Sequence, residues 1–180
     1  MKQRPASYYD ALYSSAITDD EPSEWTEELH VAVLPYIVGS VFDIGCGLGG
    51  IANRIDNALY VGVDISSVAI DYAKARCTNP RAEFFCLGYE AFHNTTLRFE
   101  TVLLLEVLEH IALMGPVVEL AKRCATGRII VTVPRDMPGR AHVHPKWTQA
   151  SLEATLGKLS ICHLFGGHDN DRWWLAIKEM

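Results

Sequence analysis

The chain has 180 residues, of which 49% are hydrophobic, so it is long enough for one globular domain with a full core. Its formal net charge of −6 and the lack of a basic stripe argue against a nucleic-acid partner, and no uninterrupted apolar run reaches the roughly 18 residues of a membrane span. The five cysteines are scattered and form no Cys-x-x-Cys pair, which favours reduced thiols and a cytoplasmic location over disulfides or a zinc site.

The N-terminal segment is predicted to be helical. Tyr8, Tyr9, Leu12 and Tyr13 recur at helical spacing, and this stripe either packs into the core or covers a site as a lid. A second helix is predicted over residues 25–37, with Ser23 as its N-terminal cap.

A regular alternation of strands and helices follows. Short apolar runs rich in β-branched residues occupy residues 41–44, 59–64, 82–87, 101–106 and 128–133. Helical patterns lie between them at residues 49–55, 66–77 and 115–125, and we expect the last of these helices to stop at Gly127. Because the strand segments are apolar on both faces, the pattern indicates a buried parallel sheet covered by helices on both sides.

After Pro134 the pattern changes. A polar loop leads to a helix over residues 149–156, capped by Thr148, and two strand-like runs follow at 159–165 and 172–178. The turn-rich segment between these runs has hairpin length, so we expect the last strand to be antiparallel. The prediction is one α/β domain over residues 1–180, built on a seven-stranded, mostly parallel sheet. It comprises a helical cap or lid (1–38), a cofactor-binding core (39–157) and a closing β-hairpin (158–180).

A glycine-rich loop follows the first predicted strand, in the segment VFDIGCGLGG at residues 41–50. Glycines there let a ligand approach the backbone, and Asp64 ends the next strand, where a carboxylate binds ribose hydroxyls. Asp43 precedes the first glycine and suits a cationic or amino-bearing ligand better than a pyrophosphate. The loop also departs from the Gly-x-Gly-x-x-Gly pattern of nicotinamide dehydrogenases, although that class stays an alternative.

The acid and alternating glycines of residues 43–49 resemble the first motif of class I S-adenosylmethionine-dependent methyltransferases. Four later segments resemble further motifs of that family: GVDIS (62–66), FETVLLLEVLEHI (99–111), GRIIVTVP (127–134) and HPKWTQASLEATLG (144–157). The similarity covers residues 38–157 in order. It implies a Rossmann-like fold, S-adenosylmethionine as cofactor with S-adenosylhomocysteine as product, and methyltransferase activity.

The resemblance also implies a set of cofactor-binding residues. Asp64 would hold the ribose, and Ile65 would lie against the adenine. Glu106, at the carboxyl end of the fourth predicted strand, would lie at the methionine end of the cofactor or at its substrate edge. The family commonly places an acid after the third strand for the adenine amino group, but this chain has Gly88 there, which leaves Tyr89, a main-chain group or Glu90 as substitutes. The predicted set is Asp43, Gly45, Cys46, Gly47, Gly49, Asp64, Ile65, Gly88, Tyr89 and Glu106, with Cys46 as a small spacer.

Three residues are predicted to be catalytic: His110, His144 and Glu109. Histidine suits removal of a proton from a hydroxyl near neutral pH, so we expect a small-molecule acceptor and an oxygen nucleophile, with nitrogen acceptors left open. Each residue also has a structural interpretation, in which Glu109 and His110 orient the turn and the loop histidines make local hydrogen bonds. Neither a membrane partner nor a particular oligomeric state is indicated.

A metal-dependent alternative rests on Glu106, Glu109 and His110 together with His142 or His144. This set resembles the carboxylate and imidazole ligands of Mg²⁺ in small-RNA 2′-O-methyltransferases, but HVHPKWT matches their segment only partly. Magnesium prefers oxygen ligands, so we assign no metal ligands and expect no divalent metal. A metal-dependent RNA 2′-O-methyltransferase and a cofactor-binding protein without turnover stay as alternatives.

Overall fold

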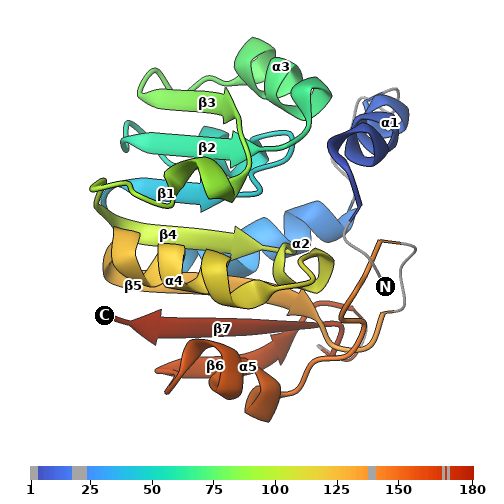
Figure 1. Cartoon of the computed structure of the whole chain (residues 1–180), viewed down its shortest axis with the longest axis vertical. Helices are drawn as coiled ribbons and strands as arrows, with labels where there is room; N and C mark the ends of the chain where they lie inside the picture. Colours follow the sequence, from blue (N-terminus) through green and yellow to red (C-terminus); the bar gives the residue numbers. More distant parts are fainter. Residues whose placement is uncertain (1–3, 18–23, 138–140, 168, 170) are drawn as a thin grey trace.

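The computed structural model describes residues 4–17, 24–137, 141–167, 169 and 171–180, and these form one seven-stranded sheet in the order β3-β2-β1-β4-β5-β7-β6 (Figure 1). The strands are β1 (Val41–Ile44), β2 (Tyr60–Asp64), β3 (Ala82–Cys86), β4 (Phe99–Leu105), β5 (Ala125–Pro134), β6 (Ile161–Phe165) and β7 (Trp173–Glu179). Strands β1 to β5 pair in parallel, whereas β7 is antiparallel to both β5 and β6. The predicted α/β fold with an antiparallel last strand is confirmed.

Helices cover both faces of the sheet, as the apolar strands predict. The helices are α1 (Ala6–Ala16), α2 (Glu24–Val33), α3 (Ser67–Arg76), α4 (Met114–Cys124) and α5 (Gln149–Leu156). Leu103 and Leu104, which are neighbours in β4, belong to different core clusters because successive strand residues face opposite sides. One cluster includes residues of α2 and α3, and the other includes residues of α4 and α5.

The strand order creates a switch point beside β1. The chain moves outward from β1 to β2 and β3, then returns so that β4 pairs with the other side of β1. In open α/β sheets, ligands bind beyond the carboxyl ends of the strands at such a point. Helix α1 lies beyond the carboxyl ends of the parallel strands, next to α3 (Figure 1). None of the α1 residues is buried.

Several element boundaries differ from the prediction. The helix expected over residues 49–55 is only a 3-10 turn, Gly50–Arg54, and β4 starts at Phe99. Gly127 lies within β5 and not at a helix end. Glycine is needed at this position because a Cβ would lie 2.6 Å from the Glu100 carbonyl oxygen. Thr148 caps α5 as predicted, since its Oγ1 accepts a hydrogen bond from the Ser151 N–H. The predicted cap Ser23 lies outside the described residues.

No helix within the described ranges is both long and apolar enough to cross a membrane.

Candidate active site

The glycine loop adopts a backbone that only glycine accepts readily. Gly45, Gly47 and Gly49 have φ values of 81°, 51° and 72°. A Cβ on Gly49 would lie 2.8 Å from the Phe84 ring and 2.9 Å from the Ala73 Cβ, so this glycine lets the loop pack against β3 and α3. The loop is therefore held close to the sheet, at the carboxyl end of β1.

Asp64 is fixed in place by backbone donors. Its Oδ2 accepts a hydrogen bond from the Gly47 N–H at 3.0 Å, and its Oδ1 accepts one from the Ser66 N–H at 2.8 Å. Burial raises the pKa of the Asp64 carboxyl, and these backbone donors oppose that rise. The carboxylate thus links the glycine loop to the start of α3, and it keeps lone pairs for a hydroxyl ligand.

Asp43 is a buried acid with half of its carboxylate unsatisfied. Its side chain is 2% exposed, and its Oδ2 accepts a hydrogen bond from the Tyr60 hydroxyl at 2.6 Å. Its Oδ1 has no hydrogen-bond partner in the described chain. Burial raises the pKa of Asp43 to about 7, the Tyr60 hydroxyl opposes this, and Asp64 adds to it. Such a group is stabilised by a cationic ligand.

The remaining loop residue, Cys46, behaves as a spacer. Burial raises the pKa of its thiol well above the ordinary value, and Asp43 and Asp64 add to the rise, so the thiol stays protonated. Its Sγ lies 2.9 Å from the point where a Cβ on Gly62 would be, which means that the thiol fills the space above that glycine.

Ile65, Gly88 and Glu90 meet at the ends of β2 and β3. The Ile65 Cγ2 lies 3.5 Å from the position of a Cβ on Gly88, and the Glu90 Oε2 is the closest atom to that position. The Glu90 side chain therefore folds back over the Gly88 backbone. Tyr89, in contrast, packs against the core cluster that contains α4 and α5 residues.

Glu106 lies directly after β4 with a positive φ of 56°. Its N–H donates to the carbonyl oxygen and to the hydroxyl of Thr132, and its side chain bonds to Thr132 and Trp173. Burial raises the pKa of Glu106 to about 7 against these hydrogen bonds and Arg172. Its Oε1 is buried without a partner in the described chain.

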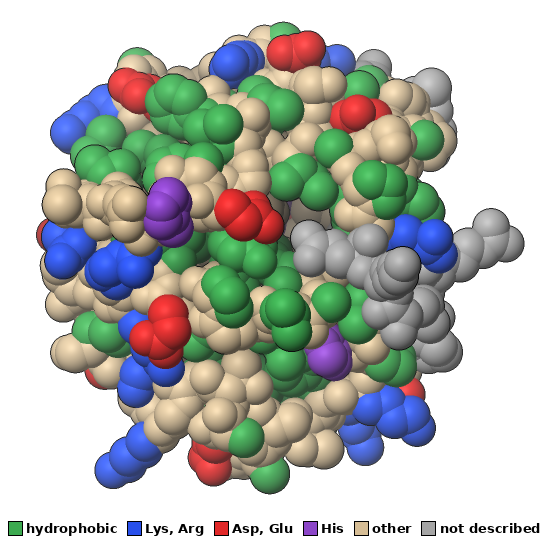
Figure 2. Space-filling view, viewed as in Figure 1, with side chains coloured by type: hydrophobic (Ala, Val, Ile, Leu, Met, Phe, Trp, Pro, Cys, Tyr) green, Lys and Arg blue, Asp and Glu red, His purple; other side chains and the backbone are tan. Residues whose placement is uncertain are grey.

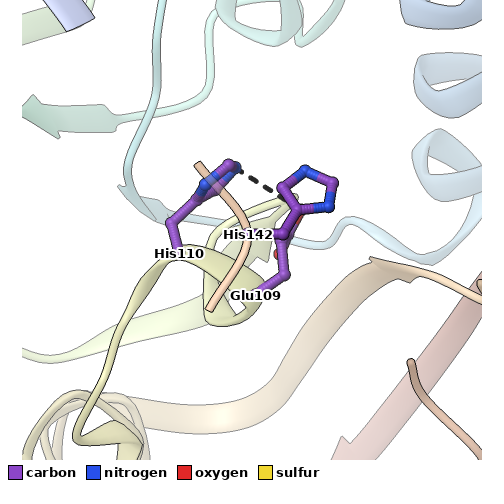
Figure 3. A group of neighbouring side chains, drawn as sticks. All are labelled: Glu109, His110 and His142. Atoms are coloured by element: carbon purple, nitrogen blue, oxygen red, sulfur yellow. Dashed lines mark ion pairs between the residues drawn. The ribbon is translucent and has the colours of Figure 1, made fainter. Parts of the chain in front are cut away.

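Three of the predicted acidic and imidazole side chains converge: Glu109, His110 and His142, here named the Glu-His-His cluster (Figure 3). The His110 and His142 ring centroids are 4.9 Å apart. The His144 ring instead lies against Trp147, with a centroid distance of 6.1 Å. His142 therefore takes the position beside His110, whereas His144, one of the three predicted catalytic residues, lies elsewhere in the loop.

His110 is a weak base in this setting. Burial lowers its pKa to about 4, His142 lowers it further, and the Ala141 carbonyl opposes the change. A general base works best with a pKa near the operating pH, so the histidine-base mechanism gains no support from this geometry.

Helix α1 closes over the loop and the cluster. The Tyr13 hydroxyl lies 2.8 Å from the position of a Cβ on Gly47, and the Tyr9 ring meets His110 edge-on at 5.9 Å. Asp10 holds α1 in place, because its Oδ1 accepts a hydrogen bond from the Ser66 hydroxyl at 2.6 Å. Sequence reasoning proposed the tyrosine stripe but missed Asp10, since one acid in an acidic segment carries no motif.

An open cavity of about 550 Å³ lies at the other edge of the sheet. Its lining includes Ser40, Leu59 and Glu100, which stand at or near the amino ends of β1, β2 and β4. None of the predicted site residues lines it, so it is separate from the site beneath α1.

A family model described as "Methyltransferase domain" matches residues 41–127, which include the glycine loop and Asp64. A curated relative, the ubiquinone biosynthesis O-methyltransferase of Bartonella tribocorum, is 34% identical over 86 residues, which are 46% of this chain and 35% of the relative. The chain thus spans about a third of the length of that relative.

Solved structures share the fold at low identity. Magnesium protoporphyrin IX methyltransferase from Synechocystis PCC 6803 with bound S-adenosylhomocysteine has a TM-score of 0.72 and 15% identity, with 97% of each chain covered. The methyltransferase domain of bacterial CtHen1 has a TM-score of 0.62 and 18% identity, with 83% of this chain and 95% of that one covered. Residues 41–127, just under half of the chain, match a methyltransferase domain, and the fold matches that of the class I S-adenosylmethionine-dependent methyltransferases.

Proposed function

We propose that this protein binds S-adenosylmethionine and transfers its methyl group to a small-molecule acceptor, with S-adenosylhomocysteine as the product. The observation that carries the proposal is the unsatisfied carboxylate of Asp43, which is buried beside the glycine loop and Asp64 at the switch point of the sheet. A dinucleotide pyrophosphate would bring negative charge to this acid, whereas the cofactor's ammonium group is a matching cation.

The residues around the loop fit the parts of the cofactor. Asp64 would bind the ribose hydroxyls, the loop glycines would let the cofactor approach the backbone, and Glu106 would face the methionine end. When bound, the cofactor supplies an electrophilic methyl group on a positively charged sulfur, which departs as a neutral thioether. The protein's main task is then to align an acceptor with that methyl group.

The adenine subsite is assigned to Ile65, Gly88 and Glu90. Gly88 carries no side chain for the adenine amino group, but the Glu90 carboxylate folds back over it. We therefore favour Glu90 over Tyr89 as the acceptor of the amino group's hydrogen bond, because Tyr89 packs against the core.

The acceptor would bind between the Glu-His-His cluster and α1. Residues 1–38 would form the lid of this pocket, residues 39–157 the cofactor-binding core and residues 158–180 the closing hairpin. An oxygen acceptor stays our preference, as the sequence suggests, and nitrogen acceptors remain open. Because burial lowers the pKa of His110 to about 4, a hydroxyl acceptor needs another route for losing its proton.

A metal-dependent RNA 2′-O-methyltransferase is the second candidate, and the Glu-His-His cluster favours it. The charge of the molecule opposes it: the net charge is −6, and on the face shown in Figure 2 the Lys and Arg side chains are scattered among acidic and apolar ones. Incubation of a cell extract with methyl-labelled cofactor separates the two candidates. If the labelled methyl group appears in RNA and is released by nuclease, the RNA methyltransferase is correct and the small-molecule proposal is rejected.

Binding of S-adenosylhomocysteine to the Asp64→Ala variant tests the cofactor assignment. Each hydrogen bond to a charged group is worth about 1.5–3 kcal/mol, so we expect an affinity loss of about 100-fold in isothermal titration calorimetry. Asp56→Ala, at the opposite edge of the sheet, is the matched control and should bind normally. Unchanged affinity in Asp64→Ala, or tighter binding of NAD than of S-adenosylhomocysteine by the wild type, would reject the proposal.

A further inference from the structure

Glu109 carries a fully buried carboxyl group that the protein does not satisfy. The residue is 0% exposed, and both side-chain oxygens lack a hydrogen-bond partner in the described part of the chain. The His110 Nε2 lies 3.7 Å from the Glu109 Oε1, which is too far for a hydrogen bond. An unsatisfied buried carboxyl group costs free energy, so such a group ordinarily has a proton or a bound ligand.

The two imidazoles beside this carboxyl group supply hydrogen-bond acceptors (Figure 3). The His110 Nδ1 contacts the Ala141 carbonyl oxygen at 3.3 Å, and the His142 Nδ1 contacts the Met137 carbonyl oxygen. A carbonyl oxygen only accepts, so in each neutral ring the Nδ1 carries the proton and the Nε2 keeps its lone pair. Burial lowers the pKa of His110 to about 4, so that ring is neutral at pH 7. The cluster therefore presents lone pairs from three side chains.

The acidic charge of this region is not neutralised by a lysine or arginine at Glu109. In the described part of the chain, no such side chain forms an ion pair with this residue. Burial raises the pKa of Glu109 well above its ordinary value, and the neighbouring Glu106 adds to the rise. Glu106 keeps one buried oxygen without a partner among the described residues, although the charge of Arg172 opposes the rise in its pKa. A positive charge from a ligand would stabilise both ionised carboxylates.

The fold holds the three acceptor side chains together. The N–H groups of Val143 and His144 donate to the Glu109 carbonyl oxygen at 2.6 and 3.1 Å. These bonds keep the loop that carries His142 on the turn after β4. A ligand that binds there avoids the free-energy cost of ordering this loop.

We propose that the methyl acceptor carries an ammonium group and that this group binds in the Glu-His-His cluster, a step that rests on the proposed function. An ammonium group on an alkyl chain has three N–H donors and no acceptor, so it complements a group of lone pairs. One ligand atom from each side chain of the cluster lies within 4.8 Å of the others. A tetrahedral ammonium with charge-assisted hydrogen bonds of about 2.8 Å spaces its acceptors roughly 4.6 Å apart, so the spacing of the cluster suits it.

A hydroxyl group is a poorer occupant of the cluster. It donates only one hydrogen bond, so the lone pairs of two of the three side chains would stay unsatisfied. It also leaves an ionised Glu109 without a counter-charge in a buried position, which is costly. The charge of the ammonium group is therefore as important for this site as its three donors.

The ammonium group would bind the acceptor and would not itself receive the methyl group. A protonated amine has no lone pair, so the methyl group has to go to another nucleophile, in agreement with the preference for oxygen. The charge of Glu106, assigned to the methionine end of the cofactor, acts on Glu109, so the two sites lie close together. The oxygen and the ammonium group would thus be separated by only a few bonds. The acceptor class is an alcohol or phenol that also carries an aliphatic amine.

A small-molecule extract with blocked amines tests the proposal on the wild-type protein. One half of the extract is treated with an N-hydroxysuccinimide ester that acylates aliphatic amines and removes their charge, and the reagent is quenched before the protein is added. Both halves then receive S-adenosylmethionine with a deuterated methyl group. Mass spectrometry should find a deuterated product with a free amine in the untreated half and no deuterated product in the acylated half. Methylation in the acylated half, or a product without an amine, would overturn the proposal.

Glu109→Gln tests the residue itself, because it keeps the size of the side chain and removes its charge. In a dilution series of the active extract fraction, the concentration that gives half the maximal rate should rise about 100-fold, since loss of one partner of a buried charge pair weakens binding by that order. The maximal rate should change far less. Glu119→Gln, which removes an exposed acid on α4, is the matched control and should behave as the wild type does.

Two results would contradict this role of Glu109. One is an unchanged half-maximal concentration in a Glu109→Gln variant whose circular dichroism matches the wild type, because the carboxylate would then not bind the acceptor. The other is a chelator that raises the half-maximal concentration of the wild type as much as the substitution does. In that case a metal ion, and not an ammonium group, would occupy the cluster.

Calorimetry with S-adenosylhomocysteine separates this inference from the proposed function. Glu109→Gln and the wild type should bind S-adenosylhomocysteine equally. If the wild type binds it and methylates the acylated extract, the ammonium site is rejected and the methyltransferase assignment stands. If the untreated extract yields no methylated product, the methyltransferase assignment is rejected and this inference with it.

Discussion

Asp43 combines deep burial with a free carboxylate oxygen, and this combination links its protonation to ligand binding. In the free protein, burial raises its pKa to about 7. A positively charged ligand next to the carboxylate would favour the ionised form and lower that pKa. Binding of S-adenosylhomocysteine, whose ammonium group is cationic at neutral pH, would therefore release a proton from this residue.

Cofactor affinity should consequently rise with pH. With a free-state pKa of about 7, Asp43 is about one-tenth ionised near pH 6 and about nine-tenths ionised near pH 8, so affinity should increase about 10-fold over this interval. Calorimetry in buffers of different ionisation enthalpy measures the released protons. Asp43→Asn should bind more weakly and lose this pH dependence, while a variant that keeps the full dependence would show that another group titrates.

At the scale of elements, α1 depends on a few polar contacts. It has no buried residue, and Asp10 connects it to Ser66, the N-terminal cap of α3, and to the Val68 N–H at 3.4 Å. The Tyr9 and Tyr13 side chains lie against His110 and Gly47, so we propose that α1 moves when a cofactor reaches the glycine loop. We call the Asp10 contacts with Ser66 and Val68 the latch, because they would hold α1 in its position over the site.

Asp10→Ala should release this latch. We expect faster amide hydrogen exchange across residues 6–16 and faster dissociation of S-adenosylhomocysteine in stopped-flow measurements, with little change in the denaturant midpoint of the whole domain. Ser14→Ala is the control, since the Ser14 hydroxyl donates to the Asp10 carbonyl oxygen within the same helix. Unaltered exchange in α1 would mean that apolar contacts with α3 hold the helix, and the latch would be rejected.

The elements also show how far the sequence alone predicts this fold and site. Inner strands such as Val41–Ile44 are predictable because two-sided burial leaves a continuous apolar run, whereas the less buried edge strands β3 and β6 are recognised from their apolar residues alone. Gly127 misled the prediction, since a glycine needed for close approach to Glu100 looks the same in the sequence as a helix stop. His142 and His144 are two residues apart in one loop, and only the contacts of that loop with Glu109 decide which one reaches His110.

At the scale of the whole molecule, the pH dependence of stability reflects groups whose pKa is shifted by burial, and the half-buried His30 is one of them. His30 on α2 packs against Gly50, just after the glycine loop, with its Cε1 2.8 Å from the position of a Cβ there. Burial lowers the pKa of His30 to about 4, Arg54 lowers it further, and Glu27 opposes this. The imidazole of the folded protein is therefore neutral at pH 7, and its protonation would place a cation next to Arg54.

The contribution of His30 to the free energy of unfolding should therefore fall on acidification. The folded-state pKa of about 4 lies below the ordinary histidine pKa of 6.5, which applies to the unfolded chain. Between these values the unfolded chain binds a proton that the folded protein rejects, so stability is highest above about pH 6.5 and declines as the pH falls toward about 4. The His30 contribution near pH 5 amounts to about 2 kcal/mol. Asp43 acts in the opposite sense, since its raised pKa makes the folded state bind protons more readily over this range.

Comparison of variants isolates the His30 part of this pH dependence. We expect urea unfolding to show that His30→Gln gains stability relative to the wild type as the pH falls. The difference in unfolding free energy, variant minus wild type, should be about 2 kcal/mol larger near pH 5 than near pH 7. His93→Gln removes an exposed imidazole and should run parallel to the wild type. If the wild-type and His30→Gln curves stay parallel from about pH 7 to about pH 5, His30 protonates equally in both states. The packing of α2 against the turn after the glycine loop would then be looser than the structure shows.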